Sequence, residues 1–160
     1  MKNTIGYLGV FLLSISINAK SEIQESHVHG FATLTLVLEN ELLEIQFESP
    51  AANLIGFEHK AISPEEKRAV ITTQTILKSP ARLFSFIGTN CKSTETVVDM
   101  SAVMGGEHRY LEDYNHGSSH GDRSHSEIKS HYQFICKKAK NLKSVSIALF
   151  SQFPNIKTIH

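Results

Sequence analysis

Two neighbouring segments alternate apolar and polar residues with a period of two, and this pattern constrains the fold most strongly. Residues 29 to 39 (HGFATLTLVLE) and residues 42 to 48 (LLEIQFE) both show it. One side carries the apolar residues Ala32, Leu34, Leu36, Leu38, Leu43, Ile45 and Phe47. Period two with β-branched residues is typical of strands. Because Glu39-Asn40 supplies a turn between the segments, we expect a β-hairpin.

The clearest helix signal is SPEEKRAVITTQTILKSP, residues 63 to 80. Ser63 is a good N-cap, Pro64 occupies the first helical position, and Glu66 completes a capping box. Lys78 lies in the last turn and Pro80 follows the expected stop. A stripe at helical spacing contains Ala69, Val70, Thr73, Ile76 and Leu77. The pattern predicts one main helix over about 63–78.

The rest of the chain favours more strands. Ser49-Pro50 ends the second strand, because proline lacks a ladder donor, and a turn or short helix follows. Further strands are expected at residues 94–100 (TETVVDM), 131–136 (HYQFIC) and 144–150 (SVSIALF), and another could start at 155–160 (NIKTIH). We therefore expect an α+β domain: an antiparallel sheet, one main helix, and a histidine-rich loop at about 105–130.

The first residues indicate export. MKNTIGYLGVFLLSISINAKSE begins with Lys2, is apolar from Ile5 to Ile17, and then reaches the small residue Ala19. This is the layout of a secretory signal peptide, and the apolar run is shorter than the roughly 20 residues that span a bilayer. We expect a signal peptide over 1–19 and a single metal-binding domain over 20–160. A membrane anchor or a buried N-terminal helix is the alternative.

The charge balance and the motifs narrow the function. Lysine plus arginine equals aspartate plus glutamate, 16 each. A neutral chain argues against nucleic acid or an anionic membrane as a partner, since both need a basic surface. The chain has no G-x-S-x-G, no H-E-x-x-H and no Gly-rich phosphate loop. We therefore expect that the chain is not an enzyme.

The chain has two cysteines, Cys91 and Cys136. In an oxidising compartment an even count indicates a disulfide, here closing a loop of about 45 residues and stabilising by about 3 to 4 kcal/mol on the chain-entropy argument. A pair of thiolate metal ligands is the alternative, but the close spacing of zinc knuckles is missing.

Residues 108 to 131 hold five of the nine histidines. A histidine-rich tract is a compositional signal for metal binding, and neutral imidazole needs almost no deprotonation to bind. Imidazole and carboxylate suit zinc, with copper and nickel close behind. The expected ligands are His108, His116, His120, His125 and His131, helped by Asp113 and Asp122. A solvated polar loop, or one that senses pH, is the alternative.

Two shorter groups could add ligands. His27 and His29 point to one face of an extended segment, so they can share a metal; otherwise they are solvated residues before a strand. Glu58 and His59 could be a ligand and its supporting partner, or a turn that satisfies its own hydrogen bonds. We expect His27, His29 and His131 to form the fixed part of a site.

An ordered set of motifs resembles a known family. HVHG, SPAANLIGFEH, a lone cysteine, a histidine-rich insert, YQFIC and LFSQFP follow one another over about 27–155. The set resembles the ZrgA-like family of periplasmic zinc-binding proteins. The resemblance implies a protein of Gram-negative bacteria that binds zinc for uptake and works beside a zinc ABC importer and its solute-binding protein. It places the histidine-bearing motifs at His27 and His29, at Glu58 and His59, and in the insert from 108 to 131.

Two other functions stay open. The chain could be a small secreted protein-interaction domain whose histidines form a solvated loop. It could also sequester copper or nickel through the same ligands, although no Met-rich tract points to copper(I).

Overall fold

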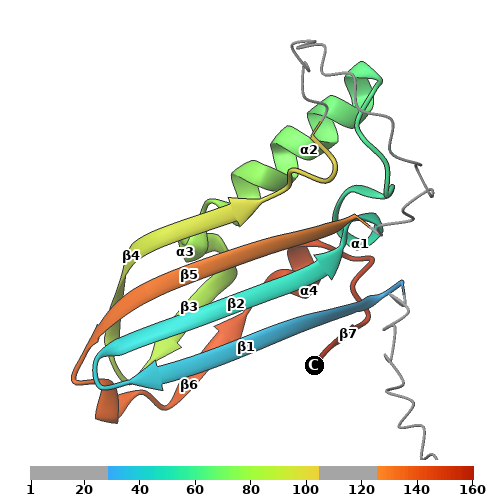
Figure 1. The fold of residues 1–160 in the computed structure, drawn as a ribbon. Coiled ribbons are helices and arrows are strands. Elements are labelled where there is room, and N and C mark those ends of the chain that lie inside the picture. Colours follow the sequence, from blue (N-terminus) through green and yellow to red (C-terminus); the bar gives the residue numbers. More distant parts are fainter. Residues whose placement is uncertain (1–28, 105–125) are drawn as a thin grey trace, which may run out of the picture.

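The computed structural model describes residues 29–104 and 126–160. A five-stranded sheet with the order β4-β5-β2-β1-β7 forms one layer (Figure 1). Its neighbours pair antiparallel except β1 and β7, which pair parallel. The strands are β1 (Phe31–Glu39), β2 (Leu42–Pro50), β4 (Asn90–Asp99), β5 (Glu127–Lys137) and β7 (Thr158–Ile159).

The second layer covers one face of this sheet, which we call the inner face (Figure 1). Its strands β3 and β6 pair antiparallel in a sheet of their own. The layer contains α1 (Ala51–Ile55), α2 (Pro64–Leu77), α3 (Pro80–Leu83), β3 (Phe84–Ile87), η1 (Ala139–Asn141), β6 (Ser144–Ile147) and α4 (Leu149–Gln152). None of the helices in the described part of the chain is long and apolar enough to cross a membrane.

The predicted hairpin is confirmed, with Leu38 opposite Leu43 next to the turn. Leu43, Ile45 and Phe47 are fully buried on the inner face. Burial of each such side chain stabilises the fold by roughly 1.5 to 3 kcal/mol. Leu36 and Leu38 lie on the same face but are exposed.

The predicted main helix is also confirmed as α2. The amide N–H of Glu66 donates to Ser63 Oγ at 3.1 Å, and the amide N–H of Ser63 donates to Glu66 Oε2 at 2.9 Å, which completes the capping box. Val70, Thr73 and Leu77 are buried against the rest of the domain. The helix therefore forms where its caps and its apolar stripe both require it.

Cys91 lies directly opposite Cys136 in the β4–β5 pair, and the two form a disulfide. The expected disulfide is therefore present in the structure. It joins the strands that precede and follow residues 105–125, so both ends of that segment belong to one cross-linked pair of strands.

The α+β class is confirmed, and two details differ from expectation. Residues 144–150 were expected to form one strand, but β6 ends at Ile147 and Leu149 begins α4, with its side chain buried. A short apolar run does not distinguish strand from helix by its period, and here tertiary burial decided. The parallel β7 also makes the main sheet mixed rather than purely antiparallel.

A candidate metal site at one end of the sheet

Four strand ends meet at one end of the main sheet, which we call the His29 end. β1 and β5 begin there, and β2 and β4 end there, beside α1 (Figure 1). The loop over residues 56–62 packs against these ends. Its residues hold both boundaries of the histidine-rich segment: the Ala61 amide donates to the Val103 carbonyl at 2.9 Å, and Ser126 Oγ donates to the Glu58 carbonyl at 2.8 Å.

The same end holds an imidazole–carboxylate pair. His29 Nε2 lies 3.1 Å from Glu58 Oε1. The His29 side chain is 70% exposed and that of Glu58 is 25% exposed. The His29 side chain is therefore accessible to a solvated ion, while most of the Glu58 side chain is covered by the protein.

Asn53, in α1, positions the backbone that carries His29. Its side-chain oxygen accepts from the Gly30 amide at 2.7 Å, and its side-chain nitrogen donates to the Phe31 carbonyl at 2.8 Å and to Ser49 Oγ at 3.1 Å. Asn53 is only 3% exposed, and without it the Gly30 amide would be buried without this partner and the partly buried Phe31 carbonyl would lose its donor. Sequence reasoning missed Asn53; its signal was a single polar residue inside the apolar helix AANLI.

Gly30 makes the turn between His29 and β1. Its φ is +90°, a conformation that residues with a Cβ rarely adopt, and an added Cβ would lie 3.2 Å from Lys157 Cγ. The glycine of the HVHG motif thus has a structural role: it allows the chain to turn from His29 into the sheet.

The distance within the pair is that of a hydrogen bond, and it is also close to the distance between two ligand atoms of one zinc ion. Zinc binds imidazole nitrogen and carboxylate oxygen at roughly 2.0 to 2.2 Å in a tetrahedron, which places two ligand atoms about 3.3 Å apart. The 3.1 Å separation of His29 and Glu58 needs only a small adjustment. Within residues 29–104 and 126–160, no group of three or more His, Cys, Asp or Glu side chains is placed to hold a metal.

His59 adjoins Glu58 in sequence but has other partners. Its Nε2 lies 3.0 Å from Glu66 Oε1, and its ring packs against Phe57 with centroids 4.9 Å apart. The second oxygen of Glu66 accepts from the amides of Ile62 and Ser63. These backbone hydrogen bonds, with a smaller effect from His59, lower the pKa of Glu66 to about 2. His59 therefore belongs to the cap of α2, and the structure does not bring it to His29.

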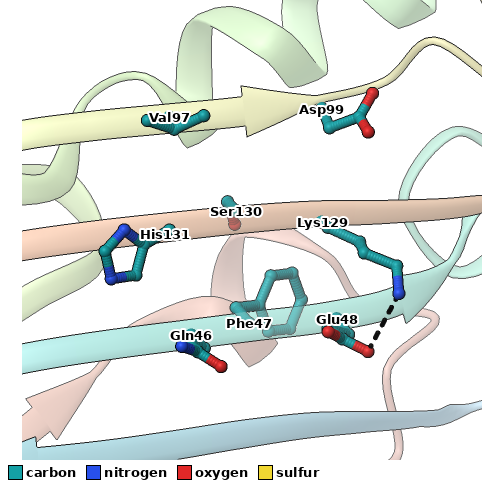
Figure 2. A pocket seen from close by; sticks show the side chains of 8 residues that line it. All are labelled: Gln46, Phe47, Glu48, Val97, Asp99, Lys129, Ser130 and His131. Atoms are coloured by element: carbon teal, nitrogen blue, oxygen red, sulfur yellow. Dashed lines mark hydrogen bonds and ion pairs between the residues drawn. The ribbon is translucent and has the colours of Figure 1, made fainter.

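His131 lies on the outer face of the sheet, away from the His29 end. Figure 2 shows it on β5 between Val97 of β4 and Gln46 of β2, beside a shallow hollow of about 140 Å³. Its Nε2 is 4.0 Å from Glu44 Oε1, beyond hydrogen-bond distance. The same cross-strand row continues to Thr35, six residues beyond His29, so the two histidines are roughly 20 Å apart.

The other expected ligands lie outside the described residues. This applies to His27, His108, His116, His120, His125, Asp113 and Asp122. Of the expected fixed set, the structure therefore describes only His29 and His131 and places them apart.

Comparison with known proteins gives one family. The family described as "ZrgA family zinc uptake protein" matches residues 26–160, which is most of the chain. No curated protein matches the chain.

Proposed function

This chain belongs to the ZrgA family of zinc uptake proteins, and we propose that it is a periplasmic protein that binds zinc and contributes to zinc acquisition. The observation that carries the proposal is the His29–Glu58 pair, 3.1 Å apart at the end of the sheet. The histidine-rich segment begins after Met104 and ends before Ser126, and contacts of the 56–62 loop hold both of its boundaries there. The proposal includes no catalysed reaction.

The chain itself offers the remaining ligands in the right places along its sequence. His27 precedes His29 by two residues, the spacing that puts two side chains on one face of an extended segment. His125 precedes Ser126, whose hydroxyl donates to the Glu58 carbonyl. We assign these four residues, His27, His29, Glu58 and His125, to one tetrahedral zinc site.

The other histidines have secondary parts in the proposal. His108, His116 and His120, with Asp113 and Asp122, would collect ions near the site and raise the local zinc concentration. His59 acts through the loop, because its contact with Glu66 fixes the residues that follow Glu58. His131 would bind zinc separately and weakly beside Glu44.

The destination of the zinc follows from the proposed role in uptake. An exported binder serves uptake only if it passes its ion to a transporter, so we propose the solute-binding protein of a zinc ABC importer as the acceptor. Such an exchange needs exposed ligands, and His29 is exposed.

Calorimetric zinc titration of the mature chain at pH 7 and pH 5.5 tests the proposal. We expect a Kd below about 1 μM at pH 7 and weaker binding at pH 5.5, because protons compete for imidazole. His29→Ala and Glu58→Gln should each weaken binding by about tenfold or more. His160→Ala is the matched control, because it removes an imidazole that is not among the proposed ligands. The His160 ring is stacked on Phe31 instead, with ring centroids 5.5 Å apart.

Binding weaker than about 100 μM would contradict the proposal and favour the secreted interaction domain. Replacing residues 105–125 by a Gly-Ser linker separates the two parts of the proposal. If the site needs His125, that replacement weakens the binding. Copper and nickel titrations alongside test for sequestration of those metals, which the same ligands would permit.

A further inference from the structure

The end of the molecule opposite the His29–Glu58 pair carries five exposed lysines, and we propose that it docks on an anionic phospholipid surface. We call this the lysine end, and it consists of Lys92, Lys137, Lys138, Lys140 and Lys143 together with the turns that carry them. It lies where β1 and β5 end and β2 and β4 begin (Figure 1). The length of β5 places it roughly 30 Å from the His29 end.

Three turns are packed together at this end. The amide of Cys136 donates to the Glu41 carbonyl at 2.7 Å, which joins the β1–β2 turn to β5. The amide of Lys143 donates to the Ile87 carbonyl at 2.8 Å. Gly88 has a φ of +97°, and the Asn141 carbonyl occupies the space that a Cβ would need. The lysines therefore extend from a rigid base that is also cross-linked by the disulfide.

The turns at this end carry more lysines than carboxylates although the chain as a whole is neutral. None of the ion pairs among the described residues involves any of the five lysines. Two carboxylates, Glu39 and Glu41, belong to the same turns, and Glu44 and Glu95 lie in the next row of the outer face, on either side of Gln133. Lys137, Lys138, Lys140 and Lys143 lie beyond that row, at the tip of this end. A separated charge distribution creates a local field even when the net charge is zero. The balance of charges along the sequence therefore does not exclude an anionic surface as a partner.

Three apolar side chains are exposed near the lysines: Ile135 on the outer face of the main sheet, Leu38 on its inner face, and Ile87 on β3. Ile87 is 55% exposed, Leu38 45% and Ile135 40%. Exposed apolar groups beside flexible lysines suit the boundary between headgroups and acyl chains, where the ammonium groups reach the phosphates and the apolar groups enter the bilayer.

A hollow at the same end has room for a headgroup. It has a volume of about 450 Å³ and is lined by Asn40, Glu41, Lys138, Ala139, Lys140 and Asn141. Lysine ammonium and asparagine amide groups are donors to phosphate oxygens. The Glu41 carboxylate accepts from the Lys138 amide at 3.4 Å. Docking here would direct the His29–Glu58 pair away from the bilayer.

Co-sedimentation of the full chain, after signal removal, with vesicles tests the inference. The probe is a mixture of phosphatidylglycerol and phosphatidylethanolamine, compared with phosphatidylcholine alone, in the presence of a chelator so that zinc plays no part. We expect binding to the anionic vesicles only, weakening as salt is raised. The variant Lys138→Glu/Lys140→Glu/Lys143→Glu should lower the affinity by about tenfold or more.

The matched control is Lys60→Glu/Lys67→Glu/Lys78→Glu, which makes the same charge change on exposed residues away from the lysine end and should leave binding intact. A melting curve of each variant shows whether it is folded. Equal binding to both vesicle types, or equal binding by the two triple variants, would overturn the inference. So would retention on heparin or polyglutamate without vesicle binding, which would indicate an acidic protein partner. Because zinc is absent, none of these results depends on the proposed zinc site.

Discussion

The two ends of the main sheet are built by different means. At the His29 end, side chains hold the backbone: Asn53 holds the start of β1, and Glu66 holds the loop that follows Glu58. At the lysine end, hydrogen bonds between backbone turns and the Cys91–Cys136 disulfide hold the backbone. A site that binds and releases an ion needs exposed ligands on positions fixed by buried polar groups. An electrostatic surface needs only a rigid base for charged side chains.

Removing the disulfide should have the largest effect on stability. Cys91→Ala/Cys136→Ala opens a loop of 45 residues, and chain entropy predicts a loss of about 4 kcal/mol in the free energy of unfolding. Urea denaturation measures this loss. Because the disulfide lies at the lysine end, zinc affinity of the folded variant should stay within about twofold. A parallel fall in zinc affinity would show that the two ends are coupled.

Asn53→Ala should affect the opposite end. It leaves the buried Gly30 amide and the partly buried Phe31 carbonyl without their partner, which costs about 2 to 3 kcal/mol. Zinc affinity should fall as well, because the backbone beside His29 is no longer fixed. Urea denaturation and zinc titration of the same variant give both values. Val70→Ala, a buried change in α2, is the control: it lowers stability without weakening zinc binding.

The smallest effect is expected from acid at Glu66. Its pKa is about 2 in the folded chain against an ordinary 4.5, so the folded state favours the ionised form. The resulting stabilisation is present above about pH 4.5 and is lost as the pH falls toward 2. Glu66→Gln should flatten this part of the stability–pH curve, measured by denaturation between pH 2 and 5. Glu65→Gln is the control, since Glu65 is exposed and pairs with the exposed Arg68 on the surface of α2; if both variants flatten the curve equally, the cap is not the cause.

Much of the fold could be predicted because it rests on local signals. Ser63, Pro64 and Glu66 define the start of α2 within four residues, and the period of two defines β1 and β2 from their own sequence. The disulfide was expected from a count of two cysteines in a chain whose first residues predict export. By contrast, β7 and the β3–β6 sheet form through long-range pairing, and short segments of this kind have no strong local period.

The sequence by itself determined the α+β class, the hairpin, the main helix, the disulfide and the kinds of side chain available to bind a metal. Only the tertiary structure decided which of these side chains meet. The strand order places His131 on the outer face and roughly 20 Å from His29, while the fold of the 56–62 loop brings Glu58 to His29 and sends its neighbour His59 to Glu66. The tertiary structure also places five lysines of this neutral chain at one end of the sheet. Strand periodicity and helix capping depend on interactions between residues that are close in sequence. Which side chains of different strands and loops come together depends instead on how the whole core is buried.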